Sequence, residues 1–251
     1  MRWRRAVGFG DAEAVITSLV VGAVALNVLA AALVLARGPV FHTRVYRPML
    51  LNLGLSVAPL VVLLVGLVVV LVARVVVGAW LAWVLGVLAF GFWLLLLPNA
   101  GYLVTELNLS HRSDDEDVPM WFDVVLVISL AMSGVLNTVL NVFVAQAEYV
   151  LLRYGDAAAP LHSWDAVALV VAILVLVAFG MYLGRSLRLN SWDVRHPRSL
   201  LGKLRRHVRK PGAIGETVAF TLLYALFFAV MYGVIVGPVI QALIELERLR
   251  A

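Results

Sequence analysis

Cysteine is absent from this chain. Disulfides, thiol nucleophiles, thiolate zinc sites and iron–sulfur ligation are therefore excluded. Charged side chains are scarce as well: they make up 14% of the 251 residues, whereas a soluble domain has roughly 25%. Hydrophobic residues make up 63% of the chain, which is more than a water-soluble core of this size can enclose. A soluble enzyme and a disordered chain are excluded, and a membrane protein with several spans remains.

Six long stretches of the chain contain no Asp, Glu, Lys or Arg. Each can hold the roughly 20 apolar residues that a helix needs to cross a bilayer. Because lipid offers no partner to unpaired backbone groups, these spans must be helices. The sequence predicts an all-α fold, a polytopic six-transmembrane-helix bundle in a single domain over residues 1–251. The predicted spans lie at residues 14–36, 49–73, 76–97, 122–146, 165–187 and 217–243.

The basic residues are distributed unequally between the two sides of the predicted bundle. Thirteen of the 20 lysines and arginines fall on the side opposite the termini, nine of them between Arg185 and Lys210. Because basic residues are retained in the cytoplasm, the Arg185–Lys210 loop is predicted to be cytoplasmic and both termini are predicted to lie outside. The basic residues Arg2, Arg4 and Arg5 oppose this orientation.

One stretch of this loop has the pattern of an interfacial helix. The segment Arg195–Lys210 carries Leu200, Leu204 and Val208 four residues apart among basic side chains. Such a basic amphipathic segment is typical of a helix that lies on anionic lipid. A nucleic-acid partner would also need basic charge, but the apolar stripe and the membrane context argue against it.

The third span ends in a polar stretch that begins with a proline. Pro98 removes a helical donor and frees backbone carbonyls before it. Asn99, Tyr102, Thr105 and Glu106 follow within about two helical turns. One interpretation is a kinked helix end whose polar side chains bond the freed backbone groups. The other is a binding pocket around a broken helix.

The fourth span carries polar residues at a spacing of four. Ser129, Ser133, Asn137 and Asn141 therefore lie on one stripe of a helix. Hydrogen bonding between helices is the favoured interpretation, and the small Gly134 fits it by allowing close approach. A polar pathway for a substrate or ion is the alternative.

The fifth span ends in Arg185 and Arg188, three residues apart and on one helical face. Two guanidinium groups there suit a phosphate or carboxylate, although ordinary anchoring at the membrane surface gives the same pattern. Glu106 and Asp123 are predicted partners of these arginines, because buried charges are seldom left unpaired. Alternation of the six spans brings this polar end to the same membrane face as other polar residues. The candidate ligand-binding residues on that face are Asn52, Asn99, Tyr102, Thr105, Glu106, Trp121, Asp123, Arg185, Arg188, Asn190, Trp192 and Asp193.

The same face carries an acidic loop. Asp114–Asp117 together with His111 could hold a divalent cation through oxygen ligands, but a solvated loop is the favoured interpretation. We therefore predict no metal and no cofactor. The remaining histidines have no ligand spacing and receive no role: His42, His162, His196 and His207.

At these polar stretches the sequence resembles a bacterial family of multi-pass membrane proteins, the domain of unknown function thirteen sixty-one. The matching stretches spread over roughly residues 48–240 and are Leu51–Pro59, Leu97–Glu106, Trp121–Asp123, Tyr182–Arg185 and Asn190–Asp193. The chain departs from the family pattern at Gly101, where proline is preferred, and at Glu106, where aspartate is preferred. The resemblance implies a protein of the bacterial inner membrane and supplies no activity.

Three functions stay open on the sequence alone. The first is binding of an anionic group, such as a lipid headgroup, in a polar pocket at the cytoplasmic face. Glu106 and Asp123 could then act as acid or base, so whether the protein is an enzyme is left open. The second is a small transporter, against which stands the lack of a repeated half. The third is a structural or assembly protein without a ligand.

Overall fold

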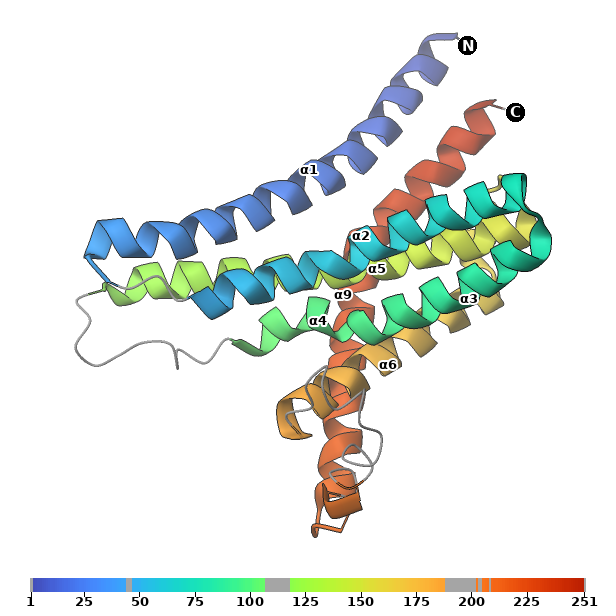
Figure 1. Ribbon diagram of the computed structural model, residues 1–251. Helices are drawn as coiled ribbons and strands as arrows, with labels where there is room; N and C mark the ends of the chain where they lie inside the picture. The colour runs from blue at the N-terminus through green and yellow to red at the C-terminus, as the bar shows by residue number, and fades with distance from the viewer. Residues whose placement is uncertain are drawn as a thin grey trace.

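The computed structural model describes residues 2–43, 47–106, 118–187, 202, 205–207 and 209–250 (Figure 1). Within these residues the chain forms helices and the turns that join them. The long helices are α1 (Arg2–Phe41), α2 (Arg47–Val76), α3 (Ala79–Leu96), α5 (Met120–Tyr154), α6 (Trp164–Leu187) and α9 (Ala213–Arg250). The short elements are α4 (Pro98–Tyr102), η1 (Leu103–Glu106) and η2 (Ala159–His162).

Six of the described helical segments are long and apolar enough to cross a membrane. The predicted all-α fold with six spans is confirmed. The 40 residues of α1 and the 38 residues of α9 correspond to helices of about 60 Å. Both exceed the roughly 30 Å hydrocarbon core, so they extend beyond it.

The second and third spans form a tight antiparallel hairpin. The turn between them is Val77-Gly78, and Gly78 has a φ of 131°, a backbone conformation that favours glycine. The two helices pack closely, since a Cβ added at Gly66 would lie 3.1 Å from the Cβ of Ala89. The hairpin therefore needs no long connection.

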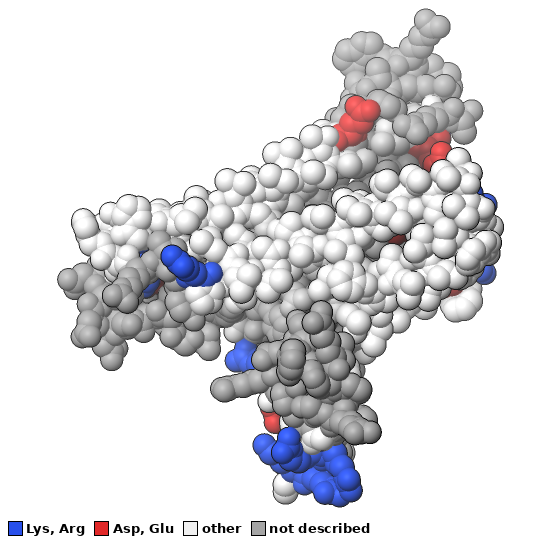
Figure 2. All heavy atoms as spheres, in the orientation of Figure 1, with Lys and Arg blue, Asp and Glu red and all other residues white. Residues whose placement is uncertain are grey.

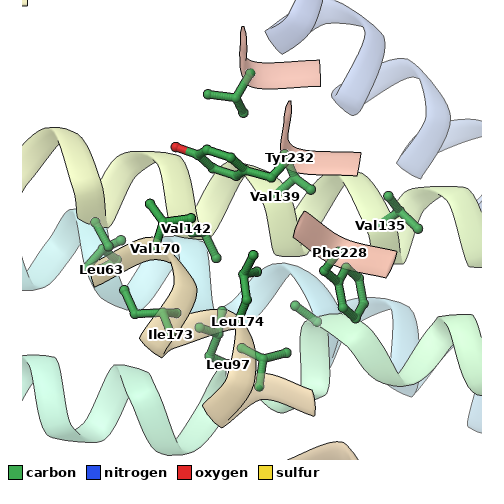
Figure 3. Packing of buried hydrophobic residues seen from close by; sticks show 14 of the residues in the cluster. Leu63, Leu97, Val135, Val139, Val142, Val170, Ile173, Leu174, Phe228 and Tyr232 are labelled. Carbon is green, nitrogen blue, oxygen red and sulfur yellow. The ribbon is translucent and has the colours of Figure 1, made fainter. Parts of the chain in front are cut away.

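The α5 helix lies at the centre of the bundle. In its most apolar 18-residue window 67% of residues are buried, against 11–44% in the other five spans. It contacts α1, α2, α6 and α9. The core beside it is apolar, with Leu97, Val139, Leu174 and Phe228 pointing toward one another from four different parts of the chain (Figure 3).

Two pairs of helix ends diverge in the fold. The end of α1 and the start of α5 lie together at one end of the molecule, whereas the end of α6 and the start of α9 lie on a separate arm (Figure 1). The short α4 lies between them and contacts α2, α5 and α6. The predicted polar face is therefore divided into two regions with α4 between them.

The polar stripe of α5 bonds neighbouring helices. Asn137 exchanges two amide hydrogen bonds with Asn27 of α1, at 2.9 and 3.0 Å, and donates a third to Ser56 of α2 at 2.9 Å. Asn141 accepts one from the indole of Trp93 of α3 at 2.9 Å. These two asparagines therefore make the interhelical bonds expected of the stripe. Ser133 differs, because it donates within its own helix to the carbonyl of Leu130.

Candidate functional site

The third span breaks at the predicted proline. Helix α3 ends at Leu96, and α4 begins at Pro98 and passes into the 3-10 turn η1 after Tyr102. The Ala100 carbonyl, near this transition, accepts a hydrogen bond from the hydroxyl of Ser56 at 3.1 Å. Irregular backbone at membrane depth requires such internal partners. The break is therefore supported by α2.

Glycines of α6 receive the side chains of α4. Pro98 packs on Gly180 and Tyr102 on Gly184. The two side chains of α4 are four residues apart in the chain, as are the two glycines of α6. A methyl group at Gly184 would overlap the Tyr102 hydroxyl. On the opposite side of the break, a Cβ at Gly134 of α5 would lie 2.8 Å from the Cβ of Leu103. Small residues on two helices thus hold the broken segment in one position.

Asp123 is paired with Arg37, a residue that the sequence interpretation left out. The Nε of Arg37 lies 3.0 Å from Oδ1 of Asp123, and the two side chains are 2% and 0% exposed. The residues next to the pair in the chain, Ala36 and Phe122, belong to an apolar cluster in which the Phe122 ring meets that of Phe41 edge-on at 4.9 Å. Asp123 thus forms an ion pair between α1 and α5. Of the two arginines expected as its partners, Arg185 bonds Thr105 and Arg188 lies outside the described residues.

Arg185 lies at the exposed end of α6 and bonds the broken segment. Its Nη1 donates to the carbonyl oxygen of Thr105 at 3.0 Å. The Thr105 hydroxyl in turn donates to the Tyr102 carbonyl at 2.8 Å. A cation at a helix C-terminus is favourable because the last carbonyls carry partial negative charge. Arg185 therefore joins α6 to the end of η1.

A small cavity lies where α6 ends and α9 begins. Its volume is about 340 Å³, and it is lined by Ser186, His207, Lys210, Pro211, Ala213 and Glu216. The basic residues Arg205, Arg206 and Arg209 are exposed in the same segment. In the space-filling view, basic side chains gather over this end of the molecule (Figure 2). The lining of the cavity thus includes two basic residues, His207 and Lys210, together with the hydroxyl residue Ser186 and the acidic residue Glu216.

The other predicted site residues are spread over the fold. Asn52 and Asn99 are half-buried, and the Trp121 ring is 66% exposed, as expected of an aromatic side chain at a span end. The backbone of Glu106 ends η1. Several other predicted features lie outside the described residues: Arg188, Asn190, Trp192, Asp193, the acidic loop at His111 and Asp114–Asp117, and most of Arg195–Lys210.

Sequence reasoning missed three of the residues that organise this region. Arg37 lies at the end of a span, where anchoring at the membrane surface already explains a basic residue. No sequence pattern links it to Asp123, which follows 86 residues later. His207 has no ligand spacing, yet its Nε2 lies 2.8 Å from the Tyr182 hydroxyl. Gly180 does have a readable signal, because it stands four residues before Gly184 in an apolar run, the pattern of close helix packing.

The fold and the polar helix ends define a polytopic helical membrane protein. Residues 51–231 match the family described as "Protein of unknown function (DUF1361)", and the chain belongs to that family. The expected membership is confirmed. No curated protein and no solved structure matches the chain.

Proposed function

We propose that the protein binds the phosphate of an anionic lipid headgroup in the cavity between the end of α6 and the start of α9. The proposal rests on the lining of this cavity, which combines Lys210, His207 and the hydroxyl residue Ser186. These groups supply the cationic and neutral hydrogen-bond donors that a phosphate accepts from. Glu216 also lines the cavity and is the one acidic residue among its described lining residues.

The position of the cavity favours a lipid over a soluble anion. It lies at the ends of two apolar spans, which is the level of the headgroups. Basic side chains near a membrane surface contribute about 1 kcal/mol each to the binding of anionic lipid. The exposed residues Arg205, Arg206 and Arg209 supply such charges beside the cavity. The protein is thus proposed to reside in the bacterial inner membrane with this end in the cytoplasm.

The buried Arg37–Asp123 pair makes the α1–α5 end less suitable for an anionic ligand than the cavity between α6 and α9. The guanidinium of Arg37 already neutralises the buried carboxylate of Asp123, so the pair offers little attraction to an anionic ligand. Arg185, by contrast, is exposed and uses Nη1 on a single carbonyl. Because a guanidinium has five donors, Arg185 can contribute further donors to a ligand.

A structural role without a ligand is the second candidate. The observation that favours it is the use of Asn27, Asn137 and Asn141 in bonds between helices. The same bonds weigh against a small transporter, because a polar pathway would need these groups for its substrate.

Native mass spectrometry of the detergent-purified protein tests the proposal. The protein would be offered equal amounts of phosphatidylglycerol and phosphatidylcholine. Lys210→Gln removes a cation from the cavity, and Arg74→Gln removes one from the exposed opposite end as a matched control. We expect bound phosphatidylglycerol to predominate in the parent and in Arg74→Gln and to decrease in Lys210→Gln. Equal binding of the two lipids by the parent would overturn the proposal and favour the structural role.

A further inference from the structure

A buried tyrosine of α6 bonds a histidine of the basic segment. Tyr182 is 1% exposed, and its hydroxyl lies 2.8 Å from Nε2 of His207. Its ring also packs on those of His207 and Phe220, at centroid distances of 5.6 and 5.4 Å. A buried tyrosine hydroxyl needs a hydrogen-bond partner. Here the partner belongs to the segment that precedes α9, so the bond fixes that segment on the bundle.

We infer that His207 contacts the bound phosphate and that Tyr182 positions the imidazole for this contact. The inference rests on the proposed function, because it concerns the same cavity, which His207 lines beside Lys210 and Ser186. With Nε2 bonded to Tyr182, Nδ1 is the ring nitrogen left for a ligand. A hydroxyl both donates and accepts, so Tyr182 can bond the neutral and the protonated imidazole alike.

The charges around His207 couple its proton to the ligand. Its own segment contributes Lys210 and the exposed residues Arg205, Arg206 and Arg209. From α6 comes Tyr182, and from α9 comes Glu216. A phosphate in the cavity favours the protonated form of an adjacent imidazole, because the two opposite charges attract. Binding of the phosphate should therefore be accompanied by proton uptake. The affinity should rise as pH falls from about 8 to about 6, the range in which histidine titrates.

The experiment titrates short-chain phosphatidylglycerol into the full-length protein in a zwitterionic detergent, at about pH 8 and about pH 6. A phosphodiester does not titrate in this range, so a change in affinity reports on the protein. We expect the parent to bind up to about tenfold more tightly at the lower pH. His207→Gln should lose this dependence. His162→Gln, at the exposed η2 of the opposite end, should keep it.

Tyr182→Phe separates positioning from charge. It keeps the ring that packs on Phe220 and every basic residue, and it removes only the hydroxyl that bonds His207. We expect the affinity at about pH 6 to fall about threefold while thermal stability stays close to that of the parent. Simple attraction of lipid to a basic surface predicts no change.

The outcomes distinguish this inference from the proposed function. A parent protein that binds phosphatidylglycerol no better than phosphatidylcholine overturns both. Preferential binding whose pH dependence persists in His207→Gln overturns the inference alone, as does an unchanged affinity in Tyr182→Phe. Loss of the pH dependence in His207→Gln together with weaker binding in Tyr182→Phe supports it.

Discussion

Arg37 of α1 and Asp123 of α5 form an ion pair at 3.0 Å, with both side chains shielded from solvent. The pair joins the end of the first span to the start of the fourth. Taking two charges out of water is costly, so removing either partner leaves a buried charge without the main group that compensates it. The arrangement assigns Asp123 to holding α1 against α5, and it leaves the acid–base role considered for this carboxylate without support from its surroundings.

The first prediction concerns this pair. Arg37→Gln and Asp123→Asn should each lower the free energy of unfolding by about 3–5 kcal/mol, because each removes one partner of a buried ion pair. The double variant should lose less than the sum of the two, since both charges are then gone. Thermal unfolding in detergent measures all three proteins. Strictly additive losses would show that the two side chains do not depend on each other.

The sequence suggested a different cycle, with Arg185 and Asp123 as partners. Arg185→Gln should now be close to additive with Asp123→Asn, because Asp123 is neutralised by Arg37. This second cycle uses the same measurement and serves as the comparison. A large coupling energy between Arg185 and Asp123 would mean that the two ends of the polar face act as one network after all.

The second prediction concerns the amide pair of α1 and α5. Asn137→Leu should lower stability by about 0.5–2 kcal/mol, because it leaves the amide of Asn27 and the hydroxyl of Ser56 without this partner. Ser133→Ala is the control on the same stripe, where the lost bond lies within one helix. We expect a clearly smaller loss there. Equal losses at both positions would argue against interhelical bonding as the purpose of the stripe.

Much of the fold could be predicted because membrane spans are specified by local composition. A run without charges must be a helix in lipid, and Pro98, followed by polar residues, marks the point where α3 ends and α4 begins. The stripe of Asn137 and Asn141 could be read from spacing, because its period matches the helix. These features depend on neighbours in the chain, and the sequence shows such neighbours directly.

The site was less predictable because its contacts join distant parts of the chain. Asp123 had several arginines on its face, and spacing does not say which of them packs against it. The choice of Arg37 depends on how α1 lies on α5. The divergence of the α6–α9 arm was likewise invisible, so residues that share a membrane face were expected to share a pocket. His207 contacts Tyr182 only because the chain turns back after α6.

The third prediction concerns orientation and uses the absence of native cysteine. Arg209→Cys and Asp156→Cys both introduce an exposed thiol, at opposite ends of the bundle. If the basic end is cytoplasmic, a membrane-impermeant maleimide added to intact cells should label Asp156→Cys and leave Arg209→Cys unlabelled until the cells are opened. The reverse labelling pattern would invert the predicted topology and place the proposed lipid site in the outer leaflet.

The fourth prediction concerns the glycines that receive the broken segment. Gly184→Ala places a methyl group where the Tyr102 hydroxyl lies, so the Tyr102 side chain or the packing of α4 on α6 must shift. We expect a loss of about 1–3 kcal/mol in stability, the usual cost of overpacking a well-filled interior. Gly233→Ala in α9 is the control, because a Cβ there meets nothing within 4 Å. It should be neutral or slightly stabilising, since alanine favours the helix over glycine.

A second substitution shows whether the steric contact is the cause. Tyr102→Ala alone removes a packed ring and should also cost stability. Combined with Gly184→Ala, however, it vacates the space that the new methyl group needs, so the double variant should be more stable than the sum of the two losses predicts. Arg185 directly follows Gly184 in the chain and bonds the carbonyl of Thr105. A change in the packing at Gly184 can therefore move Arg185, and measuring phosphatidylglycerol binding in the same variants tests whether it affects the ligand. If Gly184→Ala weakens binding and the added Tyr102→Ala fails to restore any of it, the fit of α4 against α6 does not set the position of Arg185.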